Sequence, residues 1–113
     1  MKPATVRDEL PPGTLDILIL RTLERHGSLH GFGIADAIES ASEQVLRVEE
    51  GSLYPALQRM LMKGWITGEW GRTDENRRAR YYQLTADGRK QIEVALARYH
   101  RVSAAIGRVL QPA

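Results

Sequence analysis

The chain has 113 residues, of which 42% are hydrophobic and 6% aromatic, and this suits one domain with a modest, mainly aliphatic core. The absence of cysteine excludes disulfides, thiolate metal sites and cysteine nucleophiles, and it is compatible with a cytoplasmic location. No apolar run approaches the roughly 20 residues that a membrane span requires, and the N-terminal MKPATVRDEL lacks the apolar stretch of a signal peptide. We therefore expect a cytoplasmic protein that makes no membrane contact.

The formal net charge of +2 is divided unevenly along the chain. Residues 1–50 carry 5 Lys and Arg against 9 Asp and Glu, a net of −4, whereas residues 51–113 carry 11 against 5, a net of +6. Such asymmetry is expected when one surface of a protein meets the phosphates of nucleic acid, but a basic face that contacts only solvent gives the same pattern. Charge alone leaves both interpretations open.

Short elements are predicted in the first half of the chain. Two prolines follow one another before Gly13, so residues 1–12 are expected to form an irregular arm or a short helix, and the sequence does not indicate its role. A strongly hydrophobic helix, at the centre of the core, is predicted between an N-cap at Thr14 and a stop at Gly27. After a brief extended piece, a second helix is predicted from about Gly31 or Gly33 to Ala41.

The run GSLYPALQRMLMKGWI at residues 51–66 predicts a helix with two different faces. Pro55 is tolerated only in the first turn of a helix, so the helix is expected to begin near Ser52, whose hydroxyl can cap it. The apolar stripe, expected to face the core, consists of Leu53, Leu57, Met60 and Leu61. The opposite face carries Ser52, Pro55, Ala56, Arg59, Met62 and Lys63. That face suits a helix in a DNA groove, although an ordinary amphipathic surface helix has the same pattern.

Two segments rich in aromatic and β-branched residues follow, WITGEW and RYYQLT, and polar turn formers separate them. They predict a β-hairpin. Arginines gather near its tip, at Arg72, Arg77, Arg78 and Arg80. A helix followed directly by a basic hairpin predicts a winged helix, in which the helix enters the major groove of DNA and the hairpin, called the wing below, contacts the backbone or the minor groove.

Three aromatic residues of this region have two interpretations each. Tyr54 lies at the edge of the apolar stripe, so its ring can pack in the core while its hydroxyl reaches a phosphate. Trp65 and Trp70 are expected to be buried supports of the wing, because strand alternation with Ile66 favours inward burial over stacking on bases.

The remaining residues predict one long helix, capped by Thr85 and running from about Ala86 to Leu110. At 1.5 Å per residue it is roughly 37 Å long, more than the small domain before it can cover. Residues recur along it at steps of four and three, in the pattern of a heptad seam formed by Ile92, Leu96, Tyr99, Ser103, Ile106 and Leu110. We expect this seam to build a homodimer, and packing along its own domain is the alternative.

Several motifs follow one another in a characteristic order: GTLDIL, HGFGI, LYPAL, GWI, and RYYQLT with DGR shortly after it. Over about residues 10–100 this pattern resembles the PadR family of bacterial transcriptional regulators. Gly33 departs from the pattern, which has a larger, often acidic residue there. The resemblance implies a winged helix-turn-helix domain and a C-terminal helix that builds the dimer, as in the subgroup with short C-terminal regions.

The expected fold is mainly α with a small β-hairpin, with a winged helix DNA-binding domain over residues 1–85 and a C-terminal dimerisation helix over residues 86–113. The expected function is that of a homodimeric, sequence-specific regulator, a repressor of a nearby promoter, bound to a pseudo-palindromic operator in double-stranded DNA. Its expected DNA contacts are Ser52, Tyr54, Ala56, Arg59, Lys63, Arg72, Arg77, Arg78 and Arg80. Arg59 is the candidate for a guanine contact, and the wing arginines are candidates for backbone contacts.

Other interpretations remain for particular residues. Tyr99 is either a packed core tyrosine or, as in ligand-sensing members of the resembled family, a stacking surface for an aromatic small-molecule effector near the dimer interface. His30 can bond to the local backbone or contact a DNA phosphate, with the backbone role favoured. The acidic pairs Glu49-Glu50 and Asp74-Glu75 would repel phosphate, so a winged helix that binds protein without DNA is the alternative function.

Enzymatic groups are absent from the sequence. It contains no Ser/His/Asp grouping, phosphate-binding glycine loop or paired carboxylates at a cleft, and the three histidines show no metal-ligand spacing. No enzymatic activity, cofactor or metal site is therefore expected.

Overall fold

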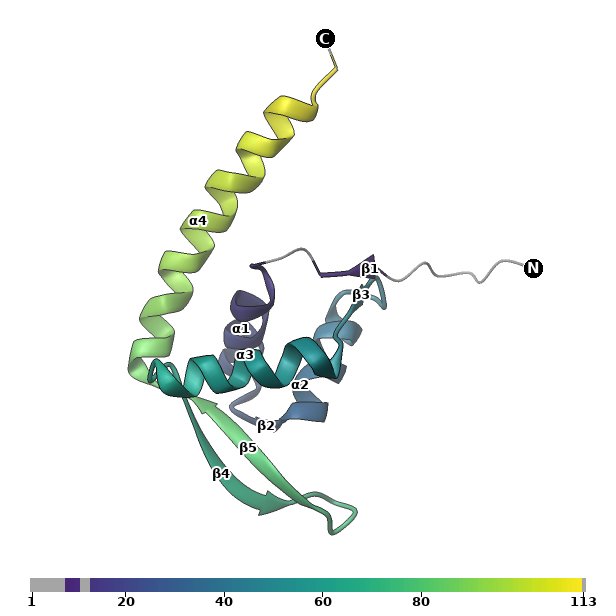
Figure 1. Ribbon diagram of the computed structural model, residues 1–113, viewed down its shortest axis with the longest axis vertical. Coiled ribbons are helices and arrows are strands. Elements are labelled where there is room, and N and C mark those ends of the chain that lie inside the picture. The colour runs from purple at the N-terminus through teal and green to yellow at the C-terminus, as the bar shows by residue number, and fades with distance from the viewer. Residues whose placement is uncertain (1–7, 11–12, 113) are drawn as a thin grey trace, which may run out of the picture.

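The structure, a computed structural model, describes residues 8–10 and 13–112. It contains, in chain order, β1 (Asp8–Glu9), α1 (Leu15–His26), β2 (Ser28–His30), α2 (Gly31–Ala41), β3 (Leu46–Arg47), α3 (Glu50–Met62), β4 (Ile66–Arg72), β5 (Arg78–Leu84) and α4 (Ala86–Leu110). The predicted fold class is confirmed: a mainly α winged helix with a small β-hairpin and a long last helix. In Figure 1 the hairpin of β4 and β5 projects from the body, and α4 runs away from it toward the C-terminus.

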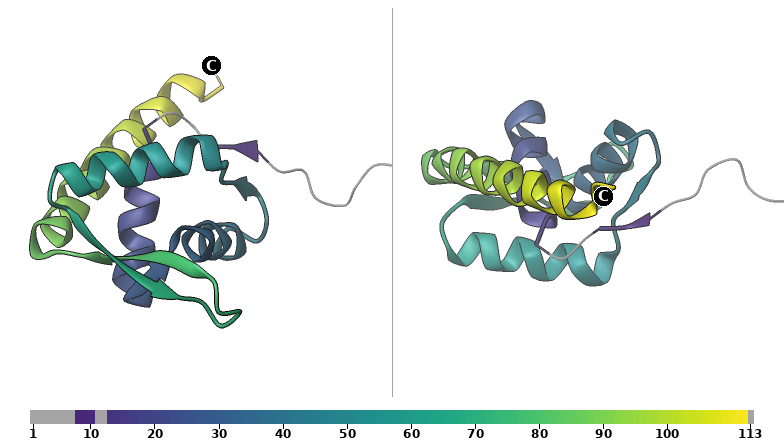
Figure 2. Two further views of the ribbon diagram at one scale, coloured as in Figure 1. Left: turned by 60° about the horizontal axis from the view of Figure 1, so that its bottom comes forward. Right: turned by 90° about the horizontal axis from the view of Figure 1, so that it is seen from above.

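The core lies around α1, which contacts α2, α3, α4 and β5 and occupies the middle of the left view in Figure 2. Each helix contributes the apolar residues of one face. The buried core side chains are Ile19, Leu20, Leu23, Ile34, Ile38, Leu53, Ala56, Leu57, Met60, Ile66, Tyr82 and Ile92. The central position predicted for the first helix is thus confirmed, as is the inward direction of the α3 stripe.

Local capping fixes where the helices begin and end. Gly27, at φ 85°, ends α1, and its backbone N–H donates to the carbonyl of Leu23 at 2.9 Å. The Nδ1 of His30 accepts from the backbone N–H of Gly33 at 2.9 Å, so His30 has the predicted backbone role, as the N-cap of α2. The hydroxyl of Thr85 caps α4 in the same way.

The start of α3 differs from the prediction. The helix begins at Glu50, with Glu49 as its N-cap residue, so Ser52 already lies inside the first turn and does not cap it. Pro55 accordingly lies in the second turn. Because proline has no N–H, the carbonyl of Gly51 loses its helical partner there, but this end of α3 is exposed and water can bond to that carbonyl.

Part of the predicted N-terminal arm forms a β-strand. Asp8 and Glu9 pair in parallel with Leu46 and Arg47, so this part of the expected irregular arm or helix is a short strand. Residues 1–7 and 11–12 of the predicted arm lie outside the described residues.

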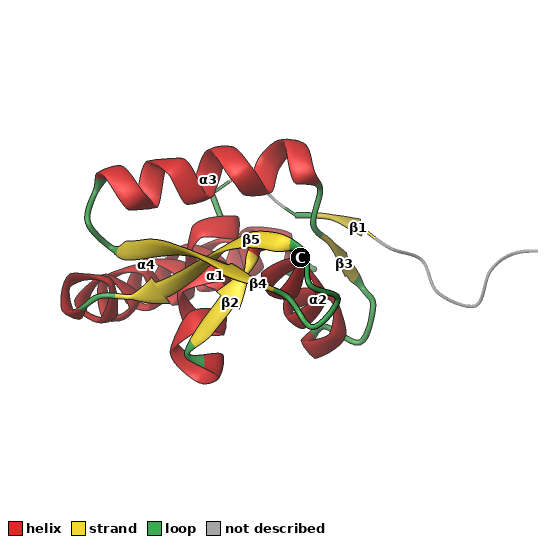
Figure 3. Cartoon of the chain, turned by 90° about the horizontal axis from the view of Figure 1, so that it is seen from below, coloured by secondary structure: helices red, strands yellow, loops and turns green. Residues whose placement is uncertain are grey.

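The two strands of the wing belong to a three-stranded antiparallel sheet with the order β2-β5-β4. Within the wing, the register runs from Ile66 opposite Leu84 to Arg72 opposite Arg78. Figure 3 shows the wing and α3 side by side, with β2 adjoining β5. The wing therefore has a root packed on the helices and a tip beyond them.

Trp70 lies on that outer part, so its predicted burial is wrong: its side chain is 61% exposed. It shares a strand face with the buried Ile66, but four residues carry it about 13 Å farther from the core. Trp65, by contrast, packs partly buried against the core as predicted.

Only the first turns of α4 belong to this core. Ile92 is buried there and Leu96 packs against it, so Ile92 cannot serve in the dimer seam that the sequence predicted and Leu96 has only part of its surface free. The cause is the approach of α4 to α1, which covers these two positions. Within residues 8–10 and 13–112, no helix has the length and apolar character needed to cross a bilayer.

Candidate nucleic-acid interface

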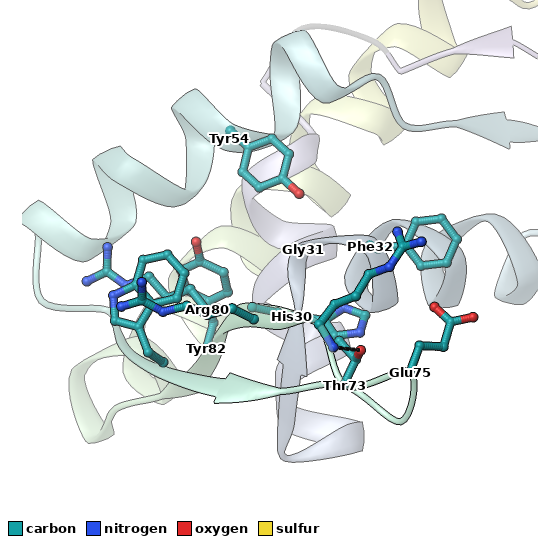
Figure 4. A pocket seen from close by; sticks show the side chains of 12 residues that line it. His30, Gly31, Phe32, Tyr54, Thr73, Glu75, Arg80 and Tyr82 are labelled. Atoms are coloured by element: carbon teal, nitrogen blue, oxygen red, sulfur yellow. Dashed lines mark hydrogen bonds between the residues drawn. The ribbon is translucent and has the colours of Figure 1, made fainter.

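A cavity of about 660 Å³ separates α3 from the wing, and the start of α2 forms its third side (Figure 4). It is lined by the aromatic residues Phe32, Tyr54, Trp70 and Tyr82 and by the arginines Arg77, Arg78 and Arg80, together with His30, Gly31, Thr73, Glu75 and Ala79. Rings and guanidinium groups around an open concave surface are suited to a ligand that is both flat and anionic, and nucleic acid is such a ligand.

Tyr54 projects from α3 toward Gly31 at the start of α2, as Figure 4 shows, and its side chain is 45% exposed. Its ring packs over Gly31, where an added Cβ would lie only 2.6 Å from the phenolic oxygen. A larger residue at the start of α2 would therefore displace the ring. The prediction that this ring packs in the core is therefore wrong: it lies on the surface of the cavity, between α3 and the start of α2.

Most of the residues predicted for the outer face of α3 do not lie on it. Ala56 is fully buried, because it follows Leu53 by three positions and so lies on the same face as the core stripe. Its predicted DNA contact is therefore wrong. The residues opposite the stripe are Pro55, Gln58 and Met62, of which Met62 is 86% exposed.

Sequence reasoning missed Gln58 on this outer face. At 100° per residue, the direction opposite the four buried positions of α3 falls between Gln58 and Met62. Glutamine can bond to adenine through two hydrogen bonds in the major groove. The signal was available in the sequence, but it required Ala56 to be counted with the core.

Arg59 and Lys63 lie on the flank of α3 away from Tyr54. An Nη2 atom of Arg59 is 3.3 Å from Oδ1 of Asp16, at the start of α1, and both side chains are partly exposed. The ammonium of Lys63 lies 4.6 Å from the ring centroid of Trp65. Exposed pairs of this kind contribute little stability, so both cations are held loosely and can be redirected.

The four predicted arginines do come together on the wing, in different settings. Arg72 donates to the carbonyl of Asn76 at 3.2 Å and so closes the turn. Arg78 stacks over Trp70, with its guanidinium carbon 4.4 Å from the ring centroid. Arg77 is exposed at the turn itself, and Arg80 lies one step in from the tip, opposite Trp70 in the register of the wing.

These features coincide with a known family. Residues 19–94 match the sequence profile of the transcriptional regulator PadR-like family. The chain belongs to the PadR-like family of transcriptional regulators.

Solved structures have the same architecture as this PadR-like regulator. A transcriptional regulator of Clostridium thermocellum shares the fold, with a TM-score of 0.79, 24% identity and coverage of 88% of this chain and 95% of that one. A PadR family transcription regulator of Clostridium difficile is 29% identical, with a TM-score of 0.71 and coverage of 88% and 100%. Bacillus subtilis PadR, in complex with operator DNA, is 26% identical with a TM-score of 0.65, over 76% of this chain and 48% of that longer one.

Tyr82 is the cavity residue of this PadR-like regulator whose pKa is changed by its surroundings. Burial raises the pKa of its hydroxyl, Arg80 partly offsets that rise, and Tyr54 adds to it. The hydroxyl is therefore neutral at physiological pH and can donate a hydrogen bond.

Among the described residues, no group of three or more His, Asp or Glu side chains is placed to hold a metal ion.

Proposed function

We propose that this PadR-like regulator binds a pseudo-palindromic operator in double-stranded DNA as a homodimer and represses a nearby promoter. The observation that carries the proposal is the continuous surface of α3 and the wing, where exposed arginines and rings surround one cavity. The operator complex of Bacillus subtilis PadR, a structural relative, supports the DNA-binding part. The net charge of +6 over residues 51–113 supports it as well.

The proposed contacts fall into two groups. The outer face of α3 enters the major groove, where Gln58 contacts base edges and Arg59, Lys63 and Ser52 reach in from the flank. The wing arginines and Tyr54 contact backbone phosphates, which supply affinity without reading the sequence. Glu75 lines the same cavity and limits how closely a second phosphate can approach.

This division predicts different results for two variants. Arg77→Ala should weaken binding to all duplexes alike and reduce the slope of log K against log[salt], because one phosphate contact is lost from each wing. Gln58→Ala should leave the salt slope unchanged and relax the preference at one base position by about 1–3 kcal/mol. Fluorescence anisotropy with an operator duplex and single-base variants measures both quantities. The same profile for the two variants would refute the division.

The dimer is proposed to form through the part of α4 that leaves the body. Exposed apolar residues follow one another there at steps of three and four, at Tyr99, Val102, Ile106 and Val109, and Leu110 lies four residues after Ile106. This stripe keeps Tyr99, Ile106 and Leu110 of the seam predicted from sequence, with Ser103 at its edge. A stripe of this length in water favours a partner helix, and a second copy supplies one with the same heptad spacing.

An aromatic effector is proposed to act at that interface. Tyr99 is 47% exposed, and its ring meets His100 at 5.6 Å and not the core, so it is available for stacking once two α4 helices meet. A ligand there would release DNA only by binding one spacing of the recognition helices better than another. Tyr99→Ala should then remove effector-induced release, measured by anisotropy, and leave effector-free DNA binding intact. Unchanged release would refute the role of Tyr99.

A further inference from the structure

Arg80 has an unusual position for a surface arginine. Its guanidinium lies flat across the adjacent strand over Gly68, where an added Cβ would be 2.5 Å from Nε and 3.3 Å from Nη2. Within the described part of the chain, the Nε of Arg80 is buried and has no hydrogen-bond partner. Gly68 thus provides the space that Arg80 occupies. No described group accepts a hydrogen bond from the Nε of Arg80.

Two tyrosines line the same cavity as Arg80. Tyr82 stands opposite Gly68 in the register of the wing, and Tyr54 enters the cavity from α3 on the side of Gly31 (Figure 4). Arg80 and Tyr54 are both close enough to Tyr82 to change its pKa, and Tyr82 remains a neutral hydroxyl. Gly31 leaves room for the ring of Tyr54, as Gly68 leaves room for the guanidinium of Arg80. Arg80 thus shares the cavity with two hydroxyl groups that can donate hydrogen bonds.

We propose that Arg80, Tyr54 and Tyr82 form a preformed seat for one phosphodiester of the DNA backbone midway along the wing. The inference rests on the DNA binding proposed above and adds to it a positioning site distinct from the turn at the tip of the wing. The mid-wing seat, as we call these three side chains with Gly31 and Gly68, fixes how the wing sits relative to α3 on the duplex.

The chemistry favours a phosphate over other occupants. A guanidinium presents several N–H donors in a fixed plane and binds phosphate oxygens through two hydrogen bonds, while phenolic hydroxyls donate to the remaining oxygens. Leaving the buried Nε–H of Arg80 unpaired is costly, and a phosphate bound to the Nη atoms of the same guanidinium would offset that cost. Arg72 and Arg78 already have partners within the wing, whereas Arg80 is held in place by shape.

A double-mutant cycle that combines substitutions at Arg80 and Gly68 in the 113-residue chain tests the seat. Arg80→Ala should weaken binding to a fluorescent duplex of arbitrary sequence about 10-fold and reduce the salt slope by about 0.9 for each wing engaged. Gly68→Ala keeps every charge but pushes the guanidinium aside, so it should also weaken binding severalfold. In the double variant the new Cβ meets no guanidinium, and affinity should equal that of Arg80→Ala alone.

Gly107→Ala is the matched control, because a Cβ there meets nothing within 4 Å, and it should leave DNA affinity unchanged. Thermal unfolding of each variant checks that the fold is retained. If the affinity losses of Arg80→Ala and Gly68→Ala multiplied in the double variant, or if Arg80→Ala left the salt slope unchanged, the proposed seat would be wrong, although DNA binding itself would stand. No binding by the unmodified chain at low salt would overturn the proposed function and the seat together.

Discussion

Ile106→Glu is expected to convert the homodimer to monomers and to lower operator affinity by about 100-fold or more. Ile106 is 53% exposed near the middle of the apolar stripe on α4, beyond the part of the helix that packs on the core. A carboxylate there would be buried without a partner in each copy of the interface. Operator affinity falls because the second half-site is bound at a high effective concentration only while the two copies stay together.

Sedimentation velocity gives the oligomeric state and anisotropy gives the affinity. Val94→Glu is the control, because Val94 is 61% exposed on the same helix but lies before the stripe that begins at Tyr99, and it should leave both quantities unchanged. A dimer that survives Ile106→Glu at micromolar concentration would show that this stripe is not the interface.

Gly88→Ala is expected to destabilise the fold by about 2–3 kcal/mol, the range typical of overpacking a core. Gly88 is buried in the first turn of α4, where an added Cβ would lie 2.2 Å from the carbonyl oxygen of Trp65. That oxygen accepts from the backbone N–H of Thr85 at 3.0 Å, so neither backbone segment can move without breaking the junction between the wing and α4.

Gly107→Ala, in the same helix, is expected to have the opposite effect on stability. A Cβ at Gly107 meets open space, so alanine should stabilise the helix by up to about 1 kcal/mol through its higher helix propensity. Urea unfolding of both variants measures the two free energies. Equal effects, or a neutral Gly88→Ala, would contradict the close contact at Trp65.

The elements that sequence reasoning predicted correctly depend on nearby residues. The stop at Gly27, the cap at Thr85 and the backbone role of His30 follow from contacts within a few positions of each residue. The hairpin and the extent of α4 follow from periodicity over a single element. Such signals are present in the local sequence and do not depend on how the elements pack.

Apart from Ala56, whose helical phase could be read locally, the main errors concern residues whose environment is set by distant parts of the chain. Ile92 fits a heptad seam, but the approach of α1 buries it in its own domain. Trp70 alternates correctly with Ile66, yet the helices do not extend far enough to cover it. Arg59 meets Asp16, 43 positions away, which no local pattern indicates.

The candidate site shows the same division. The sequence identified Tyr54 and the basic wing, because aromatic and arginine residues stand out in it. It could not identify the space that Gly31 and Gly68 leave for Tyr54 and Arg80, since such space exists only once α2, α3 and the wing are assembled.

Selection of bound duplexes from a random-sequence library by the purified chain tests whether this PadR-like regulator binds a symmetric operator. A homodimer with α3 in two major grooves should enrich a two-fold symmetric site whose half-sites lie about one helical turn apart. Binding to that site should be about 10³-fold or more tighter than to scrambled DNA, with a steep salt dependence. Recovery of no DNA at low salt, or of duplexes without a common sequence, would contradict sequence-specific DNA binding, and the former would favour a winged helix that binds protein.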